Sequence, residues 1–264
     1  MAEFYGGCDV GSTTGKAVIL RDGEIAASAI IKSTVDPEET ARIVLEEACG
    51  KVAGLSGVEA LAYLVGTGYG RNEVPFANEN ISEISCHAAG AHHCDTGIRT
   101  IIDIGGQDVK AIAVNEDGSV REFAMNDKCA AGTGRFFEAM GRTFDMSLEE
   151  FSELALSAKK VVPITAQCSV FTESEVVSLI SRKTPPPDIA AGIQAAVAKR
   201  VFALARRVGV NPKVTVTGGC AKNRGLLKAL DRVLRAEIAP LSYDPQQMGA
   251  LGAAIFAKRK AKSS

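Results

Sequence analysis

One pattern of residues occurs twice in this chain, and the repeat limits the folds that the chain can adopt. The segments "DVGSTTGKAVILRDGEI", from Asp9, and "DIGGQDVKAIAVNEDGSV", from Asp103, align at one offset that also matches Lys16 with Lys110. Each segment has the pattern of a strand, a tight glycine turn, a second strand, a DG turn and a third strand. A repeated β-hairpin with an aspartate at its first turn predicts two similar domains that face one another.

Helical patterns occupy much of the remaining sequence. The segment "SLEEFSELALSAKK" has Ser147 and Glu150 at the spacing of a capping box. The segment "QQMGALGAAIFAKRK" predicts a final helix whose small residues allow close packing. Strands and helices in this order predict an α/β protein built in two halves.

Charge and hydropathy argue against several classes of protein. The 264 residues carry 30 Lys and Arg against 31 Asp and Glu, so no net field points to nucleic acid or to an anionic membrane. No uncharged apolar run approaches the ~20 residues that span a bilayer. The first residues, "MAEFYGGCDVGSTTGK", lack the pattern of a signal peptide. We therefore expect a cytoplasmic protein that binds neither nucleic acid nor membrane.

The repeated glycine turns have the chemistry of a phosphate site. The spacing matches neither the P-loop nor the G-x-G-x-x-G fingerprint. Glycine nevertheless lets backbone amides approach phosphate oxygens, and hydroxyl and ammonium groups add donors and charge. Asp9 and Asp103, each at the end of an apolar strand, could hold a hydrated Mg²⁺. The alternative is an ordinary pair of hairpin turns, in which Asp and Gly are also favoured. The candidate donors of the first turn are Gly11, Ser12, Thr13 and Lys16.

Three motifs together resemble a known superfamily. "DVGSTTGKAVIL", "DIGGQDVKAI" and "VTVTGGCAKN" are similar to the phosphate-1, phosphate-2 and adenosine motifs of the acetate and sugar kinase, Hsp70 and actin superfamily. The resemblance implies a duplicated actin-like ATPase fold, with two RNase H-like domains around a nucleotide cleft that binds Mg-ATP. It implies a first domain of residues 1–100 plus 241–264 and a second of residues 101–240. By the same resemblance, Gly218 and Gly219 lie against the adenosine.

The cysteines raise a separate question. The chain has seven, none in a CxxC pair, so neither a zinc ribbon nor a bacterial-ferredoxin motif is present. Most are expected to be small buried hydrophobic residues. Cys129 differs, because "NDKCAAGTGRF" sets a thiol directly before a glycine-threonine turn.

A closer resemblance gives this cysteine a role. "GTGYGRN", "SEISCHAAGA", "IDIGGQDVKAI", "MNDKCAAGTGRF" and "SVFTESEVVSLIS" resemble the activator component of 2-hydroxyacyl-CoA dehydratases. That family includes the ATPase subunits of benzoyl-CoA reductases and the reductases of double-cubane-cluster proteins. The resemblance implies that Cys129 and Cys168 are ligands of one 4Fe–4S cluster shared across a homodimer. It also implies an electron donor, a ferredoxin or flavodoxin, and an iron–sulfur dehydratase or reductase as acceptor.

The residues near the two cysteines add a physical argument. Each cysteine precedes a predicted helix start, where N–H groups and the helix dipole stabilise thiolates. Thr133 is expected to cap the first helix, and Thr172 with Glu175 to form a capping box for the second. The "AGTG" turn beside Cys129 is expected to contact the nucleotide.

The remaining site residues are assigned by resemblance. Gln107 suits the orientation of an attacking water, and either Asp103 or Asp108 could act as the base. ATP or ADP would also contact a set of loop residues, namely Gly105, Gly106, Gly132, Thr133, Gly134 and Asn223.

Two other classes of function use the same nucleotide site. In a small-molecule kinase the cysteines would be core residues. An actin-like or chaperone-like module would bind ATP without transferring an electron. The segment "CHAAGAHHC", from Cys86 to Cys94, holds all three histidines. Its spacing does not fit structural zinc, so we expect a packed helix.

Overall fold

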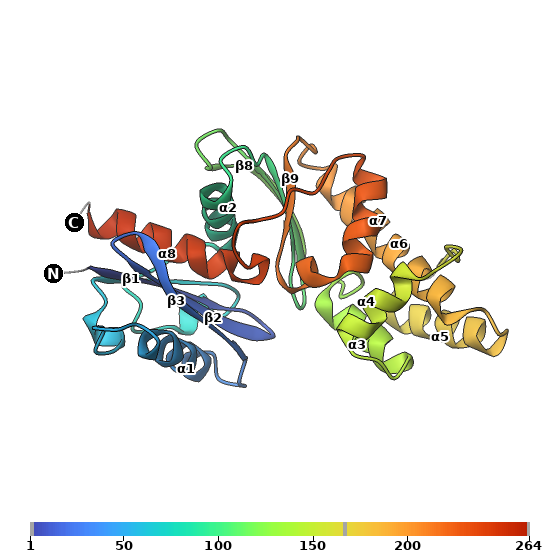
Figure 1. Ribbon diagram of the computed structural model, residues 1–264, viewed down its shortest axis with the longest axis horizontal. Helices are drawn as coiled ribbons and strands as arrows, with labels where there is room; N and C mark the ends of the chain where they lie inside the picture. The colour runs from blue at the N-terminus through green and yellow to red at the C-terminus, as the bar shows by residue number, and fades with distance from the viewer. Residues whose placement is uncertain (1–2, 166–167, 263–264) are drawn as a thin grey trace. The chain divides into compact units, whose positions relative to one another are not determined.

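The structure is a computed structural model that describes residues 3–165 and 168–262. The chain forms two compact units (Figure 1). The first comprises Met1–Ile98, Val114–Arg121 and Leu241–Ser264, and the second comprises Arg99–Ala113 and Glu122–Pro240.

A five-stranded sheet forms the centre of the first unit, in the order β3-β2-β1-β4-β5. The first three strands are antiparallel, and β4 and β5 continue the sheet in parallel. The strands are β1 (Phe4–Val10), β2 (Thr14–Arg21), β3 (Glu24–Lys32), β4 (Tyr63–Thr67) and β5 (Glu79–Asn80).

Helices cover both faces of this sheet because the strand residues alternate between two apolar clusters. Cys8, Val10 and Ile19 pack with α1 (Pro37–Gly50) on one face. Tyr5 and Val18 pack with α8 (Met248–Ala261) on the other, and Figure 1 shows these two helices on opposite sides of β1–β3. The small residues of α8 let it approach the sheet closely, since a Cβ on Gly7 would lie 2.1 Å from the Ala250 carbonyl oxygen. The helix α2 (Glu83–Cys94) packs against α8.

The second unit contains a four-stranded sheet in the order β8-β7-β6-β9. The hairpin of β6 and β7 is antiparallel, and β9 joins β6 in parallel. One apolar cluster contains strand residues such as Ile102 and Ile104 with helix residues such as Phe151 and Val197. The strands are β6 (Thr100–Ile104), β7 (Val109–Val114), β8 (Val120–Asn126) and β9 (Val214–Thr217). The helices are α3 (Gly134–Thr143), α4 (Leu148–Leu156), α5 (Ser169–Ser181), α6 (Pro186–Ala205) and α7 (Arg224–Leu234).

The predicted repeat is confirmed by the strand register. Asp9 pairs with Lys16 across β1 and β2, and Asp103 pairs with Lys110 across β6 and β7. The predicted capping box is also confirmed, because Ser147 and the side chain of Glu150 exchange hydrogen bonds at the start of α4. Short 3₁₀ turns complete the chain at Val58–Ala60, Arg71–Glu73, Gly219–Lys222 and Pro245–Gln247.

Within the described ranges, no helix combines the length and the apolar composition needed to cross a bilayer.

Candidate functional site

The first candidate site lies at the turn between β1 and β2. The Lys16 ammonium lies 3.3 Å from Asp9 Oδ2, and the two side chains are 12% and 6% exposed. The turn is tight, since the Gly11 N–H donates to the Thr14 carbonyl at 3.1 Å. A Cβ on Gly11 would lie 2.9 Å from Lys16 Nζ, so glycine leaves room for the lysine.

The hydroxyl of Thr13, at the same turn, is buried and has no hydrogen-bond partner among the described residues. Buried hydroxyls are nearly always partnered, so such a group calls for an explanation. The backbone carbonyl of Thr13 accepts a hydrogen bond from the Ser33 N–H at 3.0 Å, which fixes the turn. A phosphate oxygen would satisfy the hydroxyl, so the residues present fit a nucleotide phosphate at this turn.

The second candidate site is a buried network at the turn between β6 and β7. Lys110 Nζ lies 2.8 Å from Asp108 Oδ1 and 3.4 Å from Asp103 Oδ2. The Thr217 hydroxyl donates to Asp103 Oδ1 at 2.9 Å. The Gly105 N–H closes the turn on the Asp108 carbonyl at 3.0 Å. Gln107, at the tip of this turn, is exposed and is accessible to a solvent molecule.

A threonine-glycine pair borders each aspartate, and of these four residues only Gly218 was assigned to the nucleotide site from the sequence. In the parallel neighbour strands, Thr67 is paired with Asp9 and Thr217 with Asp103. The next residue in each case is a glycine with positive φ, 92° at Gly68 and 83° at Gly218. A Cβ would lie 2.4 Å from Asp9 Oδ1 at the first and 2.8 Å from Asp103 Oδ1 at the second. The signal that could have found Thr67 is the shared "TG" after an apolar strand.

The "AGTG" turn beside Cys129 contacts the phosphate-2 turn within the second unit. The Gly134 N–H donates to the Gly105 carbonyl, and the Arg135 N–H to the Gly106 carbonyl, both at 2.9 Å. Gly132 has φ of 109°, which favours glycine. The start of α3 is therefore fixed to the turn that follows Asp103.

The two predicted helix caps beside the cysteines are only partly correct. Thr133 is the N-cap of α3, but its hydroxyl donates to the Ala130 carbonyl at 2.8 Å and not into the helix. The predicted capping box of Thr172 is wrong, because α5 begins one turn earlier with Cys168 as its N-cap. The Thr172 hydroxyl donates back to the Cys168 carbonyl at 2.9 Å, and Glu175 accepts hydrogen bonds from Thr165.

Exposure separates the two predicted ligands from the other cysteines. Cys129 and Cys168 are the exposed members of the seven, all of which the structure describes. Burial raises the pKa of Cys49 to about 11 and those of Cys86 and Cys220 to about 12. Buried thiols with raised pKa values are poor ligands, because the thiolate is the form that binds a metal. Accessible thiols fit an iron–sulfur cluster.

The ligand count of one chain limits where such a cluster could form. No group of three or more His, Cys, Asp or Glu side chains is arranged to hold a metal ion within residues 3–165 and 168–262. Two thiols cannot complete the four-thiolate set of a cluster.

Burial lowers the pKa of Arg200, and the neighbouring Cys129 raises it, so a cation lies near that thiol.

The adenosine motif is well ordered by its own contacts. Asn223 caps α7, since its side-chain oxygen accepts from the Leu226 N–H at 2.9 Å, and its amide donates to Gln194 at 3.3 Å. Gly218 and Gly219 precede this cap and start the 3₁₀ turn after β9. The cap leaves the Asn223 side chain committed to the protein, so its contact with a nucleotide stays a prediction.

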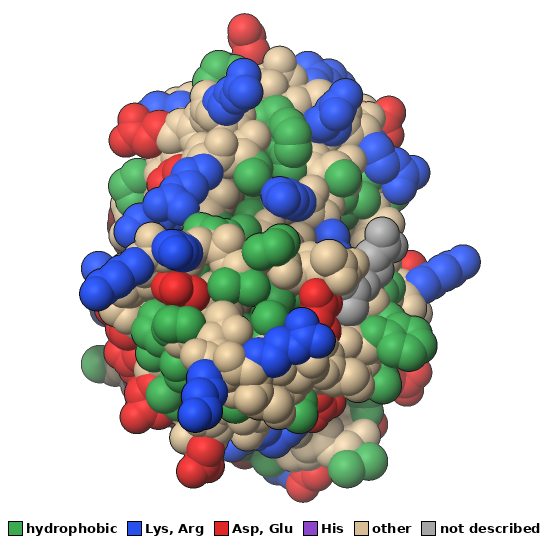
Figure 2. Space-filling model, turned by 90° about the vertical axis from the view of Figure 1, so that its right-hand side faces the viewer, with side chains coloured by type: hydrophobic (Ala, Val, Ile, Leu, Met, Phe, Trp, Pro, Cys, Tyr) green, Lys and Arg blue, Asp and Glu red, His purple; other side chains and the backbone are tan. Residues whose placement is uncertain are grey.

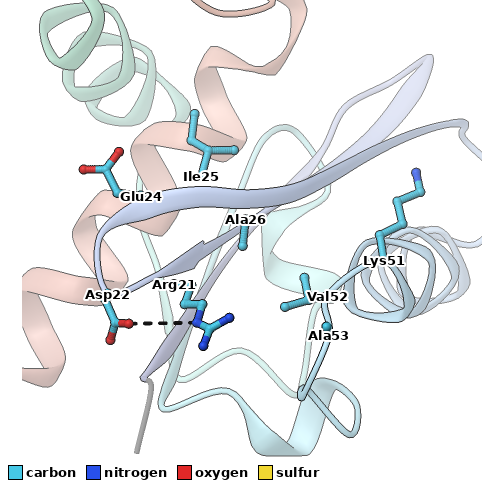
Figure 3. A pocket seen from close by; sticks show the side chains of 8 residues that line it. All are labelled: Arg21, Asp22, Glu24, Ile25, Ala26, Lys51, Val52 and Ala53. Atoms are coloured by element: carbon cyan, nitrogen blue, oxygen red, sulfur yellow. Dashed lines mark ion pairs between the residues drawn. The ribbon is translucent and has the colours of Figure 1, made fainter.

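A surface pocket of about 430 Å³ lies at the far end of the β1–β2 hairpin from Asp9 (Figure 3). Its charged groups include Arg21 and Asp22, which form an exposed ion pair at 4.0 Å. Lys51 points away from the other lining residues. Charged groups that are paired or turned outward do not form the convergent polar set of a nucleotide site. The lining residues are Arg21, Asp22, Glu24, Ile25, Ala26, Lys51, Val52 and Ala53.

The family model described as "BadF/BadG/BcrA/BcrD ATPase family" matches residues 7–257, and the chain belongs to this family. The fold is the duplicated actin-like ATPase fold predicted from the motifs. The chain is 45% identical, over 99% of both chains, to the (R)-2-hydroxyglutaryl-CoA dehydratase activating ATPase of Acidaminococcus fermentans. It is 44% identical to the activator of lactoyl-CoA dehydratase of Anaerotignum propionicum, over 97% of this chain and 98% of that one.

A solved structure of a dehydratase activator is also similar to this chain. The activator of the 2-hydroxyisocaproyl-CoA dehydratase from Clostridium difficile, with bound ADPNP, matches with a TM-score of 0.92 and 42% identity. The match covers 100% of this chain and 96% of that chain. The similarity therefore extends along nearly the full length of these relatives.

Proposed function

We propose that this chain is an ATP-hydrolysing activator that passes a low-potential electron to an iron–sulfur partner of the 2-hydroxyacyl-CoA dehydratase type. The observation that carries the proposal is the match of nearly the whole chain to dehydratase activators, at 44–45% identity. The two exposed cysteines support it independently, since a kinase of this fold would have no use for accessible thiols. We further propose that the chain acts in the cytoplasm.

Each of the two turns offers groups that would bind the phosphates of a nucleotide. Backbone amides near Gly11 and Gly105, with the Thr13 hydroxyl and the Lys16 ammonium, would bind phosphate oxygens. Asp9 and Asp103 would each offer a carboxylate to water molecules on Mg²⁺. When bound, Mg-ATP supplies the hydrolysable phosphoanhydride.

The other predicted nucleotide contacts have separate tasks. Gln107 would orient the attacking water, since its amide is exposed at the turn. Lys110 pairs with both Asp103, at 3.4 Å, and Asp108, at 2.8 Å, so either carboxylate could accept a proton through water. The adenosine would lie against Gly218 and Gly219, where an absent side chain allows close approach. The supporting loop residues are Ser12, Gly106, Gly132, Thr133, Gly134 and Asn223.

Cys129 and Cys168 would ligate a 4Fe–4S cluster together with the same residues of a second copy. A two-fold axis supplies the missing pair of thiolates, so the proposal requires a homodimer. When bound, the cluster would supply a one-electron carrier between a ferredoxin or flavodoxin and the dehydratase. Cys168 is the N-cap residue of α5, where the helix dipole favours an anionic cluster, and Arg200 places a cation near Cys129.

A short path of backbone hydrogen bonds supports coupling between ATP hydrolysis and the cluster. The start of α3 is hydrogen-bonded to the Gly105–Gly106 turn, and Cys129 lies just before this helix. A change of that turn on hydrolysis would move the segment that holds the thiol. Such a switch needs no phosphoryl acceptor.

The test is the iron and acid-labile sulfide content of anaerobically purified protein. We expect about four irons per dimer in the wild type and loss of the cluster in Cys129→Ala and in Cys168→Ala. The matched control is Cys94→Ala, which removes a half-buried thiol outside the proposed ligand set. An iron-free wild type whose ATPase is insensitive to both substitutions would leave the small-molecule kinase as the better account.

A further inference from the structure

A histidine outside the proposed nucleotide set lies beside Asp9. His87, on α2, is 5% exposed, and Asp9, at the end of β1, is 4% exposed. A Cβ on Gly249, in the first turn of α8, would lie 2.7 Å from Asp9 Oδ2 and 3.0 Å from His87 Nε2. The carboxylate and the imidazole therefore border the same small space above Gly249.

Backbone contacts between glycines and neighbouring elements fix this meeting point. A Cβ on Gly252 would lie 1.8 Å from the Cys86 carbonyl oxygen, and a Cβ on Gly90 would lie 2.3 Å from that of Met248. The helix α2 therefore touches α8 on both sides of His87. Since α8 also touches β1 at Gly7, three elements hold the imidazole and the carboxylate with little freedom.

We propose that His87 is a positioning residue for Asp9, which keeps the carboxylate in the orientation that it presents to hydrated Mg²⁺. The same carboxylate oxygen, Asp9 Oδ2, lies 3.3 Å from Lys16 Nζ, while Oδ1 faces the space at Gly68, which is closed to any side chain. The imidazole would supply the remaining restraint. This inference rests on the proposed function, because it assigns Asp9 to the Mg²⁺ of a bound nucleotide.

The test measures ADP affinity by titration calorimetry, with Mg²⁺ and with EDTA, on the full-length dimer. In His87→Ala we expect the gain in affinity that Mg²⁺ gives to fall about tenfold, the scale of one hydrogen bond to a charged group. ADP affinity in EDTA should stay at the wild-type value. Glutamine sets an amide nitrogen near the position of Nε2 and asparagine near that of Nδ1, so His87→Gln should restore the effect and His87→Asn should not.

Two further variants make the experiment robust. Gly249→Ala keeps His87 but inserts a methyl group against both side chains, so it should also lower the Mg²⁺ effect. If His87→Ala does not fold, the comparison of His87→Gln with His87→Asn carries the test. His93→Ala removes an exposed histidine from the same helix and should leave the Mg²⁺ effect unchanged.

Each contrary result has a distinct meaning. An unchanged Mg²⁺ effect in His87→Ala and Gly249→Ala overturns the inference and leaves the proposed function intact. Equal losses with Mg²⁺ and with EDTA overturn it too, because they indicate a structural role. A His87→Gln variant as weak as alanine overturns the assignment to Nε2. A wild type that neither binds ADP nor hydrolyses ATP overturns both proposals.

Discussion

The two aspartate–lysine pairs occupy equivalent places in the two halves of the chain, yet their surroundings differ. Lys16 faces one carboxylate, that of Asp9, and its side chain is 12% exposed. Lys110 faces two, those of Asp103 and Asp108, and its side chain is 2% exposed. The repeated hairpin therefore carries one ion pair in the first unit and a buried network of three charges in the second.

The two halves therefore share the backbone pairing of the hairpin but differ in the charges that surround its lysine. A lysine that is partly exposed and paired once can change partner when an anion arrives. A buried lysine paired with two carboxylates cannot leave without stranding the buried carboxylate of Asp103, and an unpaired buried ion costs several kcal/mol. We infer that Lys16 is the cation available to a phosphate and that Lys110 mainly holds the second turn in shape.

The largest expected effect is on the free energy of unfolding, and it tests the difference between the two lysines. Lys110→Met removes the cation from the buried carboxylate of Asp103 and from the partly exposed one of Asp108, and should lower the free energy of unfolding by about 3–5 kcal/mol. Lys16→Met affects one carboxylate at a more exposed site and should cost about 1–2 kcal/mol. Urea unfolding followed by circular dichroism measures both.

The same variants should differ in the opposite sense in nucleotide binding. Lys16→Met should weaken ADP binding in proportion to the lost phosphate contact, while the folded fraction of Lys110→Met should keep more of its affinity. Equal losses of stability in the two variants would contradict the difference in burial.

The repeat made the hairpins predictable from the sequence. Neighbouring antiparallel strands joined by a tight turn have their register fixed by that turn, so the pairing of Asp9 with Lys16 follows from the spacing. The same argument gives Asp103 with Lys110. The two exposed cysteines were predictable by resemblance, because their motifs are specific to one family.

Contacts between distant segments were not predictable in the same way. Thr67 and Thr217 reach their aspartates through parallel pairing, for which no turn sets the register. His87 borders the same space above Gly249 as Asp9 because α2 crosses α8 at glycines. The capping box at Thr172 failed for a local reason, since a threonine inside a helix can donate to the carbonyl four residues back.

A smaller loss of stability is expected at the glycines beside the two aspartates, where the two halves of the chain should behave alike. Gly68→Ala and Gly218→Ala each impose positive φ on alanine and press a methyl group against an aspartate, so each should cost about 2–3 kcal/mol. Gly132→Ala is the matched control, because its φ is also positive but the nearest atom to its Cβ would be 3.7 Å away. It should cost only about 1–2 kcal/mol.

Thermal and urea unfolding of the three variants provide the measurement. A Gly132→Ala variant as unstable as the other two would show that backbone strain alone sets the cost, and that the threonine-glycine pairs do not crowd the aspartates.

The smallest expected effect compares the thiols beside the two aspartates. Burial raises the pKa of Cys220, with Asp103 adding to the shift, from 9.0 to about 12. Burial also raises the pKa of Cys8, where Asp9 adds to the shift and Lys16 opposes it. A raised pKa in the folded state contributes stability that is complete below pH 9 and is lost as pH rises toward the folded value, because the unfolded thiol then releases its proton first.

Between pH 8 and pH 10 the free energy of unfolding should therefore fall by about 1 kcal/mol less in Cys220→Ala than in the wild type. Cys8→Ala should give the same difference if burial dominates in both halves. A clearly smaller difference for Cys8 would show that the more accessible Lys16 influences its surroundings more strongly than Lys110 does, and a difference independent of pH for both would contradict the burial of the two thiols.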